Sequence, residues 1–126
     1  MTSRTCILCG AVMGGLAVAL GAFGAHGLED YLVANKQSAN YETAVRYQMY
    51  HALALVLVGI LADRRPGAAL RVAGWCFPIG SVIFCGALYG IALARISQFG
   101  MVAPIGGALL IAGWAAVAIA AWRRDP

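Results

Sequence analysis

The stretch from Tyr41 to Ala62, YETAVRYQMYHALALVLVGILA, joins a polar segment directly to an apolar one. Its apolar part, residues 52–62, is too short to cross a bilayer alone, because a spanning helix needs about 20 residues. If the whole stretch spans, then Tyr47, Tyr50 and His51 enter the outer half of the membrane. Polar side chains at that depth are costly and are candidates for a functional site.

The composition of the rest of the chain is that of a polytopic membrane protein. Of its 126 residues, 62% are hydrophobic and only 11% are charged, and the mean hydropathy is +0.80. Globular proteins carry about 25% charged residues. The charges lie between long apolar runs, which predicts membrane-spanning helices. We expect an all-α, integral membrane four-helix transmembrane bundle that forms one domain over residues 1–126, with spans near residues 6–26, 43–62, 70–93 and 101–122.

The basic residues predict the orientation of these spans. Six fall on one side of a four-span chain, at Arg4, Arg64, Arg65, Arg71, Arg123 and Arg124, and three fall on the other, at Lys36, Arg46 and Arg95. The positive-inside rule therefore places both termini in the cytoplasm of a bacterial inner membrane. Because the basic residues flank apolar runs and form no patch, nucleic-acid binding is not expected. The run from Cys6 to Ala25 exceeds the about 7–15 apolar residues of a signal peptide, so we expect it to be a span.

One helical face of the stretch that begins at Tyr41 collects its polar residues. At 100° per residue, an arc of about 140° holds Thr43, Arg46, Tyr47, Tyr50 and His51, whereas Gln48 lies about 60° outside it. Since lipid would not solvate this face, we expect it to point into the bundle. His26 ends the first span on the same side, and we expect it at the depth of His51 or slightly nearer the surface.

Two interpretations of these polar residues remain open. In the first they form a ligand-binding or proton-relay site, whose candidates are His26, Arg46, Tyr47, Gln48, Tyr50 and His51. In the second they join helices by hydrogen bonds worth about 0.6–2 kcal/mol each. A metal site would use His26 and His51, but two histidines are too few for zinc unless Glu29 or Glu42 completes the set. No cofactor is expected.

The cysteines raise one enzymatic alternative. Cys6 and Cys9 form a C-x-x-C pair, as in thiol-redox proteins. They lie near the cytoplasmic end of the first span, where thiols are kept reduced, and Cys76 and Cys85 lie on different faces of the third. A thiol-redox membrane enzyme is therefore only a minor alternative, and we expect no catalytic activity.

Several motifs resemble those of a known family. GAFGAHGL at 21–28 and Y-x-T-A-x-x-Y-Q-x-x-H-A-L-A at 41–54 are similar to the two main motifs of the small bacterial inner-membrane proteins called domain of unknown function 423. The eukaryotic relatives are called transmembrane protein 256. GALY at 86–89 and APIGG at 103–107 resemble the later helices. This resemblance implies a four-helix membrane protein without an assigned activity, and it implies that His26, Tyr47, Gln48 and His51 belong to the family motif.

Two functions are therefore expected as alternatives. The first is a small-ligand, ion or proton binding or transport module, with its polar site on the outer side of the first two spans. The second is a non-catalytic accessory or assembly subunit of a larger membrane complex. The small residues of the first, third and fourth spans, such as Gly86 and Gly90, are more numerous than one bundle needs, which predicts a homo-oligomer or a membrane-protein partner besides the lipid bilayer.

Overall fold

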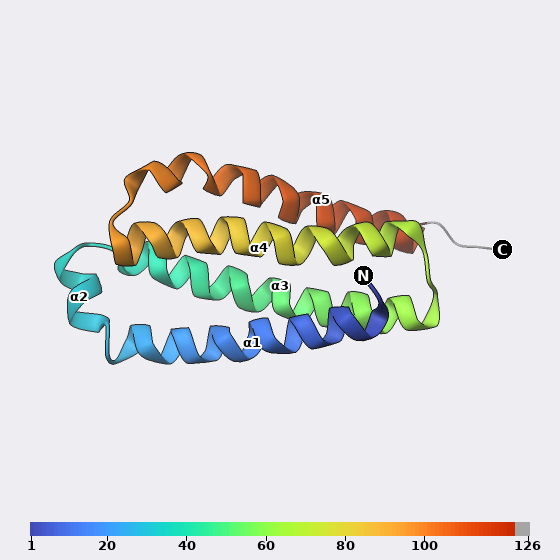
Figure 1. The fold of residues 1–126 in the computed structure, drawn as a ribbon, viewed down its shortest axis with the longest axis horizontal. Helices are drawn as coiled ribbons and strands as arrows, with labels where there is room; N and C mark the ends of the chain where they lie inside the picture. Colours follow the sequence, from blue (N-terminus) through green and yellow to red (C-terminus); the bar gives the residue numbers. More distant parts are fainter. Residues whose placement is uncertain (123–126) are drawn as a thin grey trace.

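The structure is a computed structural model that describes residues 1–122, and it is helical almost throughout. Its elements are α1 (Ser3–Ala25), α2 (Glu29–Ala34), α3 (Ser38–Arg64), α4 (Ala68–Ala94), a 3₁₀ turn η1 (Ser97–Met101) and α5 (Ala103–Trp122) (Figure 1). Four of the helices are long and apolar enough to span a membrane. The predicted four-span, all-α architecture is confirmed. Arg123 and Arg124, expected to end the last span, lie outside the described residues.

The long helices lie in the order α1, α3, α4, α5, and each runs opposite to its neighbour (Figure 1). The extensive contacts are those of α1 with α3, α3 with α4, and α4 with α5, whereas α1 touches α4 only slightly. The beginning of α1 and the end of α5 lie at the same end of the molecule. α3 and α4 are therefore the inner helices of the packing, and the other two flank them.

The outer end of the molecule is closed by α2, which lies across the ends of α1 and α3 (Figure 1). Leu32 is buried in a small cluster with Tyr41 and Ala92, and the Tyr31 hydroxyl donates to the Leu93 carbonyl at 2.9 Å. These contacts connect α2 to α3 and α4. α3 begins at Ser38, five residues before the predicted span, because the chain turns back into a helix directly after α2.

Small residues set the distance between neighbouring helices. A Cβ at Gly10 would lie 2.7 Å from the Ala52 carbonyl oxygen, and one at Gly106 would lie 2.4 Å from the Phe84 amide nitrogen. α1 therefore packs backbone to backbone on α3, and α5 does so on α4. The main core lies between these contacts and includes Leu55, Val58 and Phe77, while α4 continues through Pro78 without interruption.

Candidate functional site

The polar residues of α3 divide between the interior and the membrane-facing surface. Gln48 and His51 are buried, at 8% and 5% exposure, whereas Tyr47 and Tyr50 are 41% and 55% exposed. The prediction that one polar face points inward is therefore wrong for the two tyrosines and for Arg46, which is also exposed. The reason is the close approach of α1, whose Gly10 and Gly24 pack against Ala52 and Tyr41 on another face of α3. α3 turns inward the stripe of Tyr41, Ala44, Gln48, Ala52 and Leu55 instead.

Gln48 joins three helices through its amide. Its Nε2 donates to the Met13 carbonyl of α1 at 2.9 Å, and its Oε1 accepts from the Tyr89 hydroxyl of α4 at 2.9 Å. Two turns toward the outer end, the Tyr41 hydroxyl donates to the Leu20 carbonyl, and the Tyr41 ring packs edge to face against that of Tyr89. Both ends of the Gln48 amide are thus used within the protein.

His51 joins α3 to α5. The Trp114 indole Nε1, which can only donate, lies 3.1 Å from His51 Nε2, so that nitrogen accepts. His51 Nδ1 lies 2.6 Å from the Tyr47 carbonyl oxygen, which can only accept, so Nδ1 carries the hydrogen. The Phe77 ring packs at 5.6 Å between centroids. The geometry describes a neutral imidazole with both nitrogens occupied, which leaves neither for a metal ion.

The structure does not bring His26 and His51 together. His26 is exposed at the end of α1, whereas Gln48, close in depth to His51, contacts Met13. A helix rises 1.5 Å per residue, so His26 lies about 20 Å along α1 from that level. The prediction of equal depth is wrong, because α1 and α3 lie antiparallel with His51 at the middle of α3. Within residues 1–122, no group of three or more His, Cys, Asp or Glu side chains could hold a metal ion.

An outer cavity of 420 Å³ does exist, but it lies among α1, α2 and α3 above the predicted position. Its charged lining residues are Glu29, Glu42 and Arg46, and Tyr41 also lines it. Arg46 Nη2 and Glu42 Oε2 lie 3.3 Å apart in an exposed pair. Of the predicted candidates, Arg46 alone lines this cavity.

Three residues of the polar interior were not among the predicted candidates: Tyr41, Tyr89 and Trp114. Tyr41 lies seven residues before Gln48, two helical turns away on the same face, and this spacing could have identified it. Tyr89 ends the GALY segment, and Trp114 follows Gly113 in the last span. The spacing of these residues does not indicate which α3 residue each of them contacts. That pairing depends on how the helices are rotated against each other.

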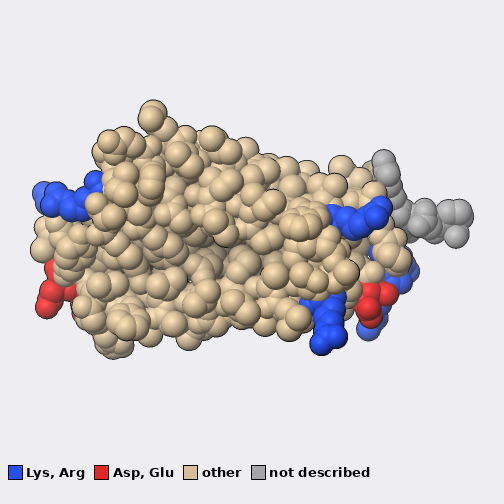
Figure 2. All heavy atoms as spheres, viewed as in Figure 1, with Lys and Arg blue, Asp and Glu red and all other residues tan. Residues whose placement is uncertain are grey.

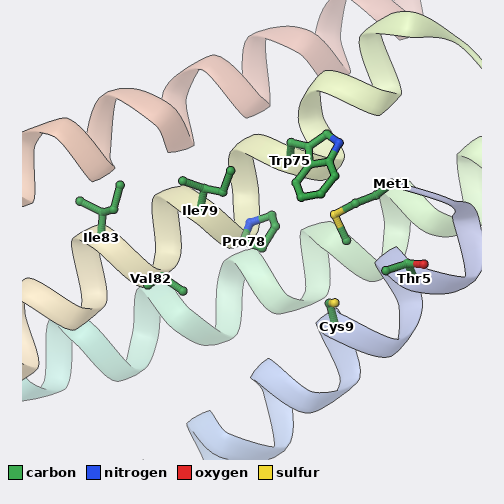
Figure 3. A pocket seen from close by; sticks show the side chains of 8 residues that line it. All are labelled: Met1, Thr5, Cys9, Trp75, Pro78, Ile79, Val82 and Ile83. Carbon is green, nitrogen blue, oxygen red and sulfur yellow. The ribbon is translucent and has the colours of Figure 1, made fainter.

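The four cysteines are free. Cys6 is buried in the main core, and its Sγ would lie 3.1 Å from a Cβ at Gly74. Cys9 lines a different space, a groove between α1 and α4 (Figure 3). Cys9 also packs against the main core, so of the two thiols of the C-x-x-C pair only that of Cys9 borders the groove.

Fold and interior together define a class: a small four-span inner-membrane protein whose helices are joined by buried side-chain hydrogen bonds. The chain belongs to the family described as "Protein of unknown function (DUF423)", whose model matches residues 20–107. It is 43% identical to the UPF0382 membrane protein YwdK of Bacillus subtilis over 116 residues, 91% of this chain and 94% of the relative. It is 35% identical to the UPF0382 inner membrane protein YgdD of Escherichia coli over 123 residues, 98% of this chain and 93% of the relative. No solved structure matches the chain. The predicted family and inner-membrane location are confirmed.

Proposed function

We propose that this protein is a non-catalytic accessory or assembly protein that binds another membrane protein through an aromatic face. This face is formed by Tyr47 and Tyr50 of α3, Phe84 of α4 and Trp114 of α5. The Tyr47 ring lies 6.0 Å from that of Tyr50 and 5.0 Å from that of Phe84. Trp114 is 48% exposed beside His51. Aromatic side chains of this kind are enriched at protein interfaces.

The observation that carries this proposal is the state of the two phenol groups. Tyr47 and Tyr50 are exposed, and neither hydroxyl has a hydrogen-bond partner in residues 1–122, unlike Tyr31, Tyr41 and Tyr89. They lie about 14 and 18 Å along α3 from its outer end, which places them below the headgroups. Hydrocarbon offers a phenol no partner, so a polar group on another protein would satisfy both.

The interior supports the same proposal over transport. A pathway for ions or protons needs polar atoms that can change partners, but those of Gln48 and His51 are already paired. Within residues 1–122, the Ser81 Oγ is the one buried side-chain polar atom that lacks a partner. A single hydroxyl does not make a relay. The polar interior then serves to hold the helices in register.

Site-directed photocrosslinking tests this proposal. A benzophenone amino acid at position 50 in native membranes should give a discrete protein adduct, because that face would contact a partner. The same probe at Val18, which is 63% exposed on α1, is the matched control and should react with lipid alone. Mass spectrometry of the adduct then distinguishes a second copy from a different protein. If position 50 yields the same lipid-only products as position 18, the aromatic face does not bind a partner.

The outer cavity favours a second candidate function, the binding of a small polar ligand. It lies among α1, α2 and α3 and carries both acidic and basic side chains, Glu29, Glu42 and Arg46. A thermal-shift screen of charged and zwitterionic small molecules with the purified protein tests this function. A true ligand should raise the melting temperature of the wild type, and Arg46→Gln should abolish the shift. Arg95→Gln, on the same side of the membrane but outside the cavity, is the control.

A further inference from the structure

A groove with an apolar lining opens between the first turns of α1 and the first half of α4, where these helices separate on either side of α3 (Figures 1 and 3). Its volume is 370 Å³. The groove is lined by Met1, just before α1, by Thr5 and Cys9 of α1, and by Trp75, Pro78, Ile79, Val82 and Ile83 of α4. Because α1 packs on α3 and has few contacts with α4, the groove between α1 and α4 is not filled by contacts between these two helices.

The depth of the groove matches one leaflet of the bilayer. From Trp75 to Ile83 it extends about 12 Å along α4, at 1.5 Å per residue. It begins near the cytoplasmic end of the helix and reaches the middle, where Ile83 lies. Half of a 30 Å hydrocarbon layer is about 15 Å. The groove therefore spans most of the inner leaflet, the length over which a lipid tail lies.

Two arginines stand at the cytoplasmic end of this groove. Arg71 precedes Trp75 by four residues, so it lies one turn nearer the cytoplasm on the same face of α4. Arg4 precedes the lining residue Thr5 in the first turn of α1. On this face, basic side chains lie over the beginnings of both helices (Figure 2). Both arginines are exposed, and neither forms an ion pair within residues 1–122.

We propose that this groove binds one anionic phospholipid of the inner leaflet. One acyl chain would lie along Ile79, Val82 and Pro78, and the phosphate would face the guanidinium groups of Arg4 and Arg71. Arginine suits this role because its planar fork donates two parallel hydrogen bonds to phosphate oxygens. A zwitterionic lipid offers the same tail, so selectivity would come from the net negative headgroup. Within residues 1–122, Asp63 is the acidic side chain at this end, and its carboxylate accepts a hydrogen bond from the Ser3 hydroxyl at 3.4 Å.

Retention of lipid during purification tests the charge requirement. Protein reconstituted with equal phosphatidylglycerol and phosphatidylcholine, then released into mild detergent, should retain one phosphatidylglycerol in native mass spectrometry. The double variant R4Q/R71Q should retain about 30-fold less, because each basic residue near an anionic membrane contributes about 1 kcal/mol. The control K36Q/R95Q removes two charges from the opposite end and should retain as much as the wild type.

A variant that fills the groove tests its position. Val82→Trp places a large ring over the groove from a residue that is 73% exposed, so the core is not disturbed. Retention should fall although both arginines remain. Ile111→Trp is the matched control, because Ile111 is 72% exposed on α5 and does not line the groove. If V82W and I111W retained equal amounts of phosphatidylglycerol, the lipid would not lie in this groove.

A measurement on the unaltered chain keeps the proposal testable if a variant fails to fold. Bromine quenches indole fluorescence on contact, and Trp75 lines the groove. Brominated phosphatidylglycerol should quench the wild type more than brominated phosphatidylcholine does, and the excess should vanish in Trp75→Phe. High salt should also reduce the excess. Equal quenching by the two lipids, or an excess that persists in Trp75→Phe, would contradict the proposal.

Discussion

At the level of single residues, Gln48 has the most connected side chain of the interior. Replacing it with Leu keeps a similar volume and removes the hydrogen bonds to Met13 and Tyr89. We expect Q48L to lose about 0.6–2 kcal/mol of unfolding free energy, the range of interhelical hydrogen bonds in membranes. Unfolding in mixed dodecylmaltoside and SDS micelles, followed by circular dichroism, measures this loss.

A double-mutant cycle separates the two bonds of Gln48. Tyr89→Phe removes the hydroxyl that Gln48 Oε1 accepts, so Q48L and Y89F lose one shared interaction. The double variant should therefore be more stable than the sum of the single losses predicts, by about 0.5 kcal/mol or more. Strict additivity would mean that the bond contributes nothing to stability.

Trp114 gives a second prediction at this level. Trp114→Phe keeps an aromatic ring and removes the donor to His51 Nε2, so that nitrogen is left buried without a partner. We expect a loss of about 1–2 kcal/mol in the same micelle assay. The control is Trp75→Phe, since Trp75 is 55% exposed and makes no hydrogen bond in residues 1–122. If W75F lost as much unfolding free energy as W114F, the smaller ring and not the lost hydrogen bond would explain the effect.

The candidate site was only partly predictable from the sequence. The motif that begins at Tyr41 directs attention to Gln48 and His51, because buried amides and imidazoles in a span need partners. Which of the neighbouring polar residues turn inward depends on the rotation of α3, and that rotation depends on α1 packing against Val45 and Ala52. The contacts that set it are long-range, so helical periodicity alone placed Tyr47 and Tyr50 on the wrong side.

At the level of helices, Gly106 is one of the glycines that allow α4 and α5 to pack closely, together with Gly80 and Gly113. A methyl group at Gly106 would lie 2.4 Å from the Phe84 amide nitrogen, and backbone atoms in a helix cannot move aside individually. Gly106→Ala should separate α5 from α4 and cost about 1–3 kcal/mol, as overpacking does. Gly107→Ala is the control, because its nearest contact is a Phe84 ring atom at 3.7 Å. Micelle unfolding that ranks the two variants equally would contradict this packing.

The turn between α2 and α3 carries a residue in an unfavourable conformation. Lys36 has φ 56°, and the amides of Lys36 and Gln37 donate to the carbonyls of Val33 and Leu32. This is a Schellman ending, in which glycine is preferred at the Lys36 position. Lys36→Gly should therefore stabilise the protein by about 1 kcal/mol. Thermal unfolding of K36G and K36A separates the backbone effect from the loss of charge, since only K36G should gain.

At the level of the whole molecule, hydropathy and charge predicted the four spans, their connections and the common side of both termini. These features follow from the lipid environment and do not require knowledge of any contact between helices. The order of packing could not be predicted in the same way. It follows from the positions of Gly10, Gly59 and Gly106 relative to their neighbours, and the glycines of all spans look alike in the sequence. Several of those expected to serve an oligomer prove to be used within the chain, such as Gly90 against Phe99.

The order α1, α3, α4, α5 has a consequence for biosynthesis. Every extensive contact joins helices that follow one another among the four spans. The chain can therefore enter the membrane as two helical hairpins, the first from α1 and α3 and the second from α4 and α5, each complete as it leaves the ribosome. The two hairpins then associate through the α3–α4 surface alone, where the Tyr89 hydroxyl donates to Gln48 Oε1. A newly made molecule thus needs no late rearrangement of helices that have already crossed.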